Sequence, residues 1–297
     1  MRLVTFEVDG AERVGELRDD MVVELDAPTM RAYFEHGGAD ETGAEHGLAD
    51  VRLRAPIAPK KFFHTAGNFR EHHEESKNVN WSHPVLPWIV FFQNIDAIIG
   101  PEDDIVYPPH GITNEMDYEL ELAVVIGKAG KFFSPEEAED YIAGYLIFND
   151  ITARDIQREE MKSGVFSLSK GIDTFCPIGP WIVTPDEIGD AHNLSMELRV
   201  NGESRQVSHT SRMSVTIPEI ISHYSPMGYS PGDILSTGTV SGVAGFSDDP
   251  MSLYLKPGDT VECEIEKVGV LRNPVISWQE GHGTPPLPRV RPWGENT

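Results

Sequence analysis

One short stretch, "YELELAVVIG" at residues 118–127, constrains the fold more than any other part of the chain. Leucine, valine and isoleucine fill half of its positions, which is typical of a buried β-strand. The same stretch carries Glu119 and Glu121, and side chains two residues apart on a strand point to the same face. A carboxylate is costly to remove from water without a partner. The fold must therefore either expose this pair or compensate its charge.

A third acidic residue, Asp150, ends another apolar stretch, "YLIFND". Adjacent carboxylates repel each other, so one stays protonated unless a cation lies between them. Three carboxylates without a nearby cysteine form an oxygen-only donor set, which suits Mg²⁺, Mn²⁺ or Ca²⁺ better than zinc. The alternative is that Glu119 and Glu121 form the wet face of an amphipathic strand in a very acidic protein. Asp117 shares their face and is either a further member of the site or solvated; we favour the solvated interpretation.

Short strand-like stretches outnumber helical ones in this chain, and the two kinds do not alternate regularly. This order favours an α+β, mostly-β architecture with a mixed sheet over a doubly wound sheet. A Ser–x–x–Glu capping box at Ser134 and Glu137 marks the start of one helix. We expect strands at 88–93, 118–127, 145–150, 180–184, 195–202, 232–238 and 259–269, and helices at 134–144, 152–161 and 216–225.

The first 55 residues differ in pattern from the rest. Residues 2–25 form short alternating runs, and Asp9-Gly10 between two of them is a strong hairpin signal. A short helix is expected within residues 28–38, which end in two glycines. We predict a small N-terminal β domain over residues 1–55 and a main catalytic domain over residues 56–297. Within it, the Pro- and Gly-rich residues 277–297 are expected to form an extended tail.

The charge of the chain excludes some classes of partner. It has 48 acidic and 24 basic residues, for a formal net charge of -24. Nucleic acid and anionic membranes bind positive surfaces, so neither is expected as a partner. The chain has no apolar run long enough to span a membrane and no secretory pattern at its start, so we predict a cytoplasmic protein. Cys176 and Cys263 are the only cysteines; they could pair, but nothing requires it, and two lone thiols suit a reducing compartment.

The stretches around these acids resemble the fumarylacetoacetate hydrolase family. The resemblance rests on "YELELAVVIGK", "GYLIFNDITARDIQ", "SKGIDTFCPIGPWIVT", "LRVNGESRQ", "GDILSTGTVSGV" and "LKPGDTVECEIEKVGVLRNPV", in order between about residues 60 and 277. It implies a mixed β-sheet roll or sandwich of the fumarylacetoacetase C-terminal type, preceded by a small N-terminal domain. It also implies a homodimer, and a divalent metal, usually Mg²⁺ or Mn²⁺, held by Glu119, Glu121 and Asp150.

A histidine and a glutamate three residues apart supply a candidate proton shuttle. His72 and Glu75, in "GNFREHHEES", share one face of a helical turn. Glu75 would orient the imidazole and raise its basicity, so that His72 activates a water molecule. The pair resembles the family's His–x–x–Glu lid, which closes over substrate. The alternative is a solvated surface turn among acidic residues.

A lysine and a glutamine match family positions near the metal. Lys170, in "SLSKGID", would hold the substrate carboxylate or an enolate oxygen. Gln157, in "TARDIQ", matches a residue that reaches the substrate. Gln93 stands where many members carry a lysine, which either changes the preferred anion or is neutral. The alternative for Lys170 is a surface lysine.

The segment "STGTVSG" predicts a turn with exposed backbone N–H groups. Gly238 and Thr239 within it could bind a carboxylate or an oxyanion, and the resemblance makes both of them substrate contacts. Arg154 and Asp155, in "TARD", are interpreted as a structural pair that braces the turn.

These parts together predict an enzyme that acts on a small 2-oxo or β-diketo acid. The reaction would be hydrolysis of a C–C bond, in a substrate of the acylpyruvate or fumarylacetoacetate type, through a metal-stabilised enolate. Isomerases, decarboxylases and hydratases of 2-oxo acids share this chemistry and stay open. A catalytically silent, metal-binding oligomer is a second class. An iron-dependent oxygenase would need two histidines and a carboxylate, and His64 and His72 lack a persuasive spacing.

Overall fold

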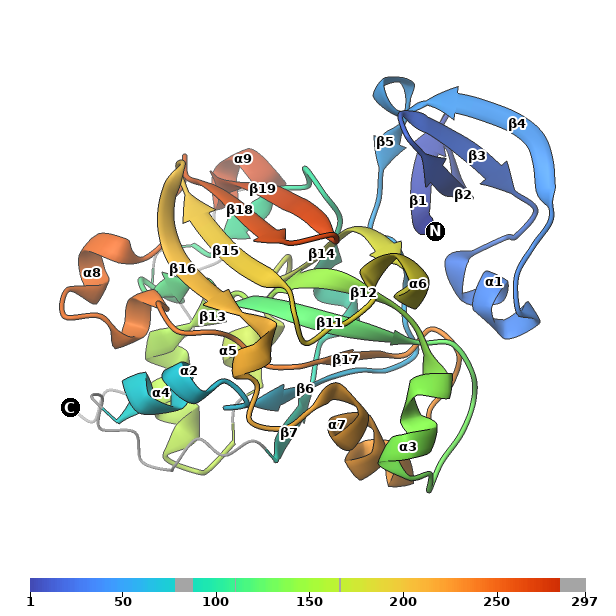
Figure 1. The fold of residues 1–297 in the computed structure, drawn as a ribbon. Coiled ribbons are helices and arrows are strands. Elements are labelled where there is room, and N and C mark those ends of the chain that lie inside the picture. Colours follow the sequence, from blue (N-terminus) through green and yellow to red (C-terminus); the bar gives the residue numbers. More distant parts are fainter. Residues whose placement is uncertain (78–87, 110, 166, 284–297) are drawn as a thin grey trace.

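The computed structural model describes residues 1–77, 88–109, 111–165 and 167–283. Its strands form a twelve-stranded sheet, a five-stranded sheet and a two-stranded ribbon, with short helices around them (Figure 1). Most strand pairs are antiparallel, and three are parallel. The α+β, mostly-β class with mixed sheets is therefore confirmed.

The N-terminal residues fold as predicted into a small antiparallel unit. Asp9 and Gly10 both have positive φ, at 51° and 72°, and close the first hairpin. The first helix begins after Thr29, whose side chain accepts a hydrogen bond from Ala32, and ends at Gly37 in the left-handed conformation. The elements of this unit are β1 (Arg2–Val8), β2 (Ala11–Arg18), β3 (Met21–Leu25), α1 (Met30–His36), β4 (Glu41–Gly47), η1 (Leu48–Asp50) and β5 (Arg52–Leu53).

The N-terminal strands continue the large sheet of the main part of the chain. Strand β1 pairs with β14, with Leu3 opposite Ile182, and the order is β4-β3-β2-β1-β14-β12-β11-β17-β6-β7. The division of the chain at residue 55 stays a prediction. The remaining strands of this sheet are β6 (Phe62–Ala66), β7 (Ile89–Phe92), β8 (Ile98–Ile99), β11 (Leu120–Ile126), β12 (Ile142–Asn149), β14 (Cys176–Val183) and β17 (Ile234–Ser236).

The five-stranded sheet packs against one face of β11. Leu122 and Val124 of β11 share a core with Leu198, Cys263 and Leu271 of the smaller sheet, so both faces of β11 are covered. A turn at Asn201-Gly202 closes one of its hairpins. Its strands are β9 (Ile105–Tyr107), β15 (Ser195–Val200), β16 (Glu203–His209), β18 (Thr260–Ile265) and β19 (Gly269–Ser277), and the separate ribbon is β10 (Met116–Asp117) with β13 (Thr152–Ala153).

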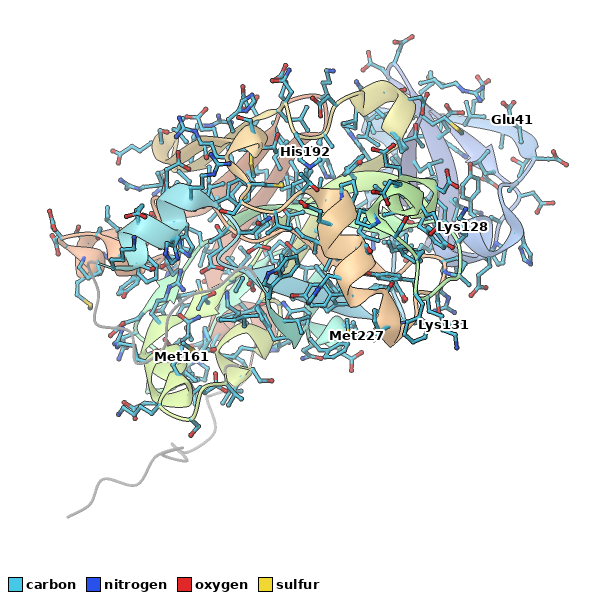
Figure 2. The ribbon with its side chains drawn as sticks, turned by 60° about the horizontal axis from the view of Figure 1, so that its bottom comes forward. Glu41, Lys128, Lys131, Met161, His192 and Met227 are labelled. Carbon is cyan, nitrogen blue, oxygen red and sulfur yellow. The ribbon has the colours of Figure 1, made fainter. Side chains whose placement is uncertain are left out.

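The helices are short and lie at the edges of the sheets. The capping box of Ser134 and Glu137 is confirmed, but α3 ends early because the chain enters β12 at Ile142. Helix α4, which carries Met161, lies far from the N-terminal unit with Glu41 (Figure 2). The helices after the N-terminal unit are α2 (Arg70–Ser76), η2 (Ile95–Ala97), α3 (Pro135–Ala138), η3 (Glu139–Tyr141), α4 (Arg154–Met161), α5 (Leu168–Gly171), α6 (Pro185–Ile188), η4 (Thr210–Arg212), α7 (Ile217–Tyr224), η5 (Ser225–Met227), η6 (Ala244–Phe246), α8 (Pro250–Leu253) and α9 (Trp278–His282).

Two details refine the sequence-based expectations. Residues 278–282 of the expected tail form helix α9, and residues 284–297 lie outside the described part. Cys176 and Cys263 are both free, as expected, and both are buried. Among the described helices, none is long and apolar enough to cross a membrane.

Candidate active site

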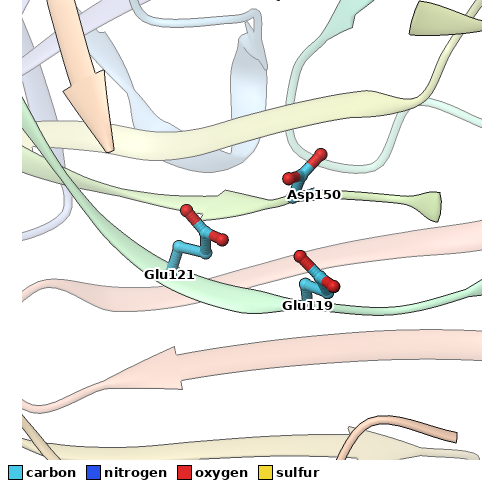
Figure 3. Close-up of side chains that lie close together, drawn as sticks. All are labelled: Glu119, Glu121 and Asp150. Atoms are coloured by element: carbon cyan, nitrogen blue, oxygen red, sulfur yellow. The ribbon is translucent and has the colours of Figure 1, made fainter. Parts of the chain in front are cut away.

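The three predicted acids meet where β11 and β12 run side by side. The strands are antiparallel, with Leu120 opposite Asn149, and the backbone N–H of Asp150 donates to the carbonyl of Glu119. The start of one strand therefore lies beside the end of the other. Figure 3 shows the carboxyl groups of Glu119, Glu121 and Asp150 pointing toward one another. One oxygen from each lies within 4.8 Å of the others, and all three side chains are buried. The exposed-face alternative for Glu119 and Glu121 is therefore wrong.

Lys170 joins this cluster from α5. Its Nζ lies 2.8 Å from Glu119 Oε2, 2.6 Å from Asp150 Oδ2 and 2.8 Å from Thr152 Oγ1. The side chain is 4% exposed, so the surface-lysine alternative is wrong. A buried ammonium between two carboxylates offsets part of their repulsion.

Asp117 is buried rather than solvated, which corrects the sequence-based interpretation. The residue is fully buried, and its Oδ2 lies 2.7 Å from Arg154 Nε. Its carboxylate also accepts hydrogen bonds from the backbone N–H groups of Ala244 and Gly245. The error arose because Arg154, which lies 37 positions further along the chain, compensates the charge.

Arg154 and Asp155 do not brace the turn as a pair. Arg154 turns inward, where its Nη2 lies 2.6 Å from Glu119 Oε1. Asp155 instead accepts hydrogen bonds from Thr113 Oγ1 and from the backbone N–H of Asn114. Arg154 is thus a member of the site that sequence reasoning missed.

The protein's own cations compensate the three acids unequally. Burial favours the neutral form of Glu119, but Lys170 and Arg154 outweigh it and lower the pKa of Glu119 to about 2. Burial, with a contribution from Glu119, raises the pKa of Asp150 to about 7 despite Lys170. Burial and the charges of Asp150 and Glu119 raise the pKa of Glu121 well above its ordinary value. Two of the three carboxyl groups therefore lack full compensation.

A divalent cation fits this cluster. Its charged side chains are Asp117, Glu119, Glu121, Asp150, Arg154 and Lys170. Four carboxylates against two cations leave an excess of two negative charges when all are ionised. Asp150 Oδ1 is buried and has no hydrogen-bond partner among the described residues. Carboxylate oxygens are the ligands that Mg²⁺ and Mn²⁺ prefer.

His72 and Glu75 lie together on α2, as their spacing predicts. His72 Nδ1 lies 3.4 Å from Glu75 Oε2, and the ring stacks on Phe246 with centroids 5.1 Å apart. Glu75 also accepts a hydrogen bond from the backbone N–H of Gly242. His72 is 6% exposed, which overturns the alternative of a solvated turn.

One pocket brings the acid cluster and His72 together. Its empty space, counted together with its opening to solvent, is about 540 Å³. Gln157, Lys170 and Thr239 lie on its wall. The lining residues are Thr65, Ala66, Gly67, His72, Ile89, Phe91, Glu119, Glu121, Asp150, Arg154, Gln157, Met161, Lys170, Thr239 and Phe246.

Gly238 shapes this wall through its backbone. It has a φ of 91°, and a Cβ added there would lie 2.9 Å from the carbonyl oxygen of Thr65. A side chain at this position would therefore push β6 away. Thr239, the next residue, donates from its Oγ1 to the carbonyl of Leu120, which ties the turn to β11. Gln93 is buried and interacts with the thiol of Cys176.

His64 is a second residue that sequence reasoning left without a role. It lies in the middle of β6, 1% exposed, with its Nδ1 3.6 Å from Asp150 Oδ2. Burial and the charge of Lys170 lower the pKa of His64 well below its ordinary value. The only signal in the sequence is a histidine inside the apolar run "KFFHTAG".

Comparison with known proteins establishes the family. Residues 61–276 match the family described as fumarylacetoacetate (FAA) hydrolase C-terminal, and residues 1–56 match the one described as Rv2993c-like, N-terminal. Because the first match covers more than half of the chain, the chain belongs to the fumarylacetoacetate hydrolase family. The resemblance seen in the sequence is confirmed.

Relatives with known names act on oxo acids in more than one way. The chain is 39% identical over 259 residues to the mitochondrial oxaloacetate tautomerase FAHD2A of Bos taurus, which covers 84% of this chain and 80% of that protein. It is 37% identical over 269 residues to the 2,4-didehydro-3-deoxy-L-rhamnonate hydrolase of Sphingomonas sp. (strain SKA58), which covers 89% and 90%. The family therefore includes both tautomerases and hydrolases.

A solved structure shares the fold and contains a metal. The maleylpyruvate hydrolase of Sphingobium sp. SYK-6, in complex with manganese(II) ion and pyruvate, superposes with a TM-score of 0.74 at 27% sequence identity. The superposition covers 93% of this chain and 99% of that chain.

Proposed function

We propose that this protein is a divalent-metal-dependent enzyme that hydrolyses a C–C bond in a small β-diketo acid of the acylpyruvate type. One observation carries the proposal: a pocket in which an incompletely compensated acid cluster faces a buried imidazole. The fit of the cluster to a hard dication and the manganese- and pyruvate-bound relative support it.

Glu119, Glu121 and Asp150 would hold the cation, with Mg²⁺ or Mn²⁺ as the expected ion and Ca²⁺ as a further candidate. When bound, such an ion supplies Lewis-acid polarisation of the substrate's 2-oxo group. Lys170 anchors Glu119 and Asp150 through its ammonium group, and so keeps two of the three carboxylates in position.

His72 would act as the base. In this proposal it takes a proton from a water molecule beside the acyl carbonyl, and returns a proton to the carbon that leaves. Glu75 Oε2 lies 3.4 Å from Nδ1 of the ring and would stabilise the imidazolium that forms. Phe246 covers one face of the ring and restricts the access of bulk water.

Three further side chains would hold the substrate. Gln157 and Thr239 offer an amide and a hydroxyl on the pocket wall, and the positive charge of Lys170 would stabilise the enolate oxygen. The backbone turn at Gly238 keeps the hydroxyl of Thr239 in place. Among the described wall residues, Ile89, Phe91, Met161 and Phe246 are apolar and favour a short apolar acyl group.

The test is a substrate panel with the purified full chain and Mg²⁺ or Mn²⁺. We expect acetylpyruvate to be cleaved to acetate and pyruvate, with pyruvate measured by a coupled dehydrogenase. The panel includes longer acylpyruvates, fumarylacetoacetate and 2-oxo diacids. Absence of turnover across the panel, with metal binding intact, would favour a catalytically silent metal-binding protein.

Tautomerisation of a 2-oxo diacid is the second candidate function, and the named oxaloacetate tautomerases at 39% identity support it. The same base and enolate stabilisation suffice, because a tautomerase moves one proton and breaks no C–C bond. The ultraviolet absorbance of the enol distinguishes the two: loss of enol-oxaloacetate without release of pyruvate would assign tautomerisation. Isomerases, decarboxylases and hydratases are tested by other members of the panel. A homodimer in the cytoplasm stays a prediction.

A further inference from the structure

We propose that His64 is a positioning residue of the metal site, which holds Asp150 from behind by a hydrogen bond when the cation is bound. The inference rests on the proposed metal site and adds to it a residue that lies outside the pocket. Four observations carry it: the position of the ring, its clamp of aromatic side chains, its unpartnered nitrogens and the 3.6 Å distance from its Nδ1 to Asp150 Oδ2.

The fold aims His64 at the acid cluster. His64 lies opposite Ser236 of β17 in the parallel pair of β6 and β17. Ser236 in turn lies opposite Ala123 of β11 and donates a hydrogen bond to Glu121. The three strands therefore present His64, Ser236 and the acids on one face of the sheet.

Aromatic rings fix the orientation of the imidazole. Phe62 and Phe91 stack on its two faces, with centroid distances of 4.9 Å and 4.4 Å and interplanar angles of 2° and 12°. Phe148 meets it edge-on at 4.9 Å. A ring clamped in this way can approach Asp150 only along its own plane, so its Nδ1 and the carboxylate are constrained to face each other.

Within the described part of the chain, no hydrogen bond accounts for an imidazole at this position. Neither ring nitrogen of His64 has a hydrogen-bond partner there, and both are buried. A phenylalanine would fill this aromatic niche without the desolvation cost of two unpaired nitrogens. Phe62 and Phe148 already show that the niche accepts phenylalanine rings.

The partner that suits His64 is Asp150. Nδ1 lies 3.6 Å from Oδ2, slightly too far for a hydrogen bond, while Lys170 and its 2.6 Å contact hold the same oxygen. Metal-binding carboxylates are commonly oriented by a second hydrogen bond from behind, and its loss typically weakens metal binding by about 10–100-fold. A shift of a few tenths of an ångström closes the His64–Asp150 pair.

The experiment measures metal binding to the metal-stripped full chain by calorimetry, with Mn²⁺ as the probe. His64→Phe keeps the aromatic stack and removes the nitrogens, so we expect the Kd to rise by about 10–100-fold. His64→Asn places an amide N–H near the position of Nδ1 and should bind Mn²⁺ close to the wild-type affinity. His64→Gln places its amide near Nε2 instead, which faces away from Asp150, and should behave like His64→Phe.

Two controls make the result decisive. His46 contacts the ring of Phe6 at a tilted angle in the N-terminal unit, so His46→Phe repeats the substitution away from the site and should leave the Kd unchanged. If His64→Phe does not fold, the comparison of Asn with Gln decides the question. Equal Mn²⁺ affinity in the wild type and His64→Phe, or equal affinity in the Asn and Gln variants, would overturn the proposal.

Two further outcomes separate this inference from the proposed function. If the wild-type chain binds no Mn²⁺, the proposed metal site is refuted, and so is the positioning role of His64. If the wild type binds Mn²⁺ and pulsed electron paramagnetic resonance shows a directly coordinated imidazole nitrogen that is absent in His64→Asn, His64 is a ligand and the positioning role is overturned.

Discussion

The two ends of the buried charge cluster differ in how completely the protein compensates their carboxylates. At one end, Asp117 is paired with Arg154 and accepts two hydrogen bonds from the backbone of η6. At the other end, Asp150 has a pKa of about 7 and an oxygen without a partner in the described residues, and Glu121 has a strongly raised pKa. At the first end the carboxylate charge is compensated without a ligand. The second end is suited to a cation that the chain does not supply.

The largest effect is expected when the incomplete end loses its charge. Glu119→Gln combined with Glu121→Gln should reduce Mn²⁺ binding below detection and turnover to the uncatalysed rate, because two of the three anionic ligands become neutral. Calorimetry measures the binding of Mn²⁺, and the pyruvate assay measures turnover. Glu115→Gln is the matched control, since Glu115 pairs with Arg158 outside the cluster. Undiminished Mn²⁺ affinity in the double variant would show that Glu119 and Glu121 do not bind the metal.

Loss of the base should affect catalysis and spare the metal. His72→Ala is expected to lower kcat by about 10²–10⁴-fold with an unchanged Kd for Mn²⁺, because the imidazole transfers a proton and does not belong to the acid cluster. His73→Ala, the neighbouring histidine, is the control and should retain turnover. A His72→Ala enzyme with the wild-type kcat would exclude His72 as the base.

Loss of the ion pair between Asp117 and Arg154 should lower the free energy of unfolding and leave the affinity for Mn²⁺ unchanged. Asp117→Asn leaves the buried Arg154 without one of its two carboxylate partners, and we expect a loss of about 3–5 kcal/mol in the free energy of unfolding. Urea denaturation in the presence and absence of Mn²⁺ measures it. A loss below about 1 kcal/mol, as for an exposed ion pair, would show that this end of the cluster is not structural.

The smallest effect concerns the pH dependence of the metal-free protein. The pKa of Asp150 and of Glu121 is raised in the folded state, so the folded chain retains protons that the unfolded chain has already released. Their contribution to stability is therefore full below pH about 4 and declines as the pH rises. The part due to Asp150 is lost as the pH rises through about 7, and the part due to Glu121 is lost well above its ordinary pKa. Glu121→Gln should flatten this decline in thermal melts of metal-free protein, whereas Glu115→Gln should not.

Much of this cluster could be predicted from local sequence. The i, i+2 spacing placed Glu119 and Glu121 on one face, and the apolar run before Asp150 placed it at the end of a strand, so their convergence needed only the pairing of β11 with β12. The hairpin at Asp9-Gly10 and the capping box at Ser134 follow in the same way from local chemistry.

The remaining features depend on contacts between distant parts of the chain. Asp117 looked solvated because its partners, Arg154 and the backbone of Ala244, lie far along the sequence. His64 received no role from the sequence because its distance to Asp150 depends on the order of the strands in the sheet. Local patterns indicate which face a residue occupies, but the sheet order decides what that face meets.

The most direct test of the central claim is a crystal structure of the full chain grown with Mn²⁺, with data collected at the manganese absorption edge. We predict one strong anomalous peak per chain, within coordination distance of Glu119, Glu121 and Asp150. An anomalous map with a manganese ion bound elsewhere and no peak among these three carboxylates would contradict the account.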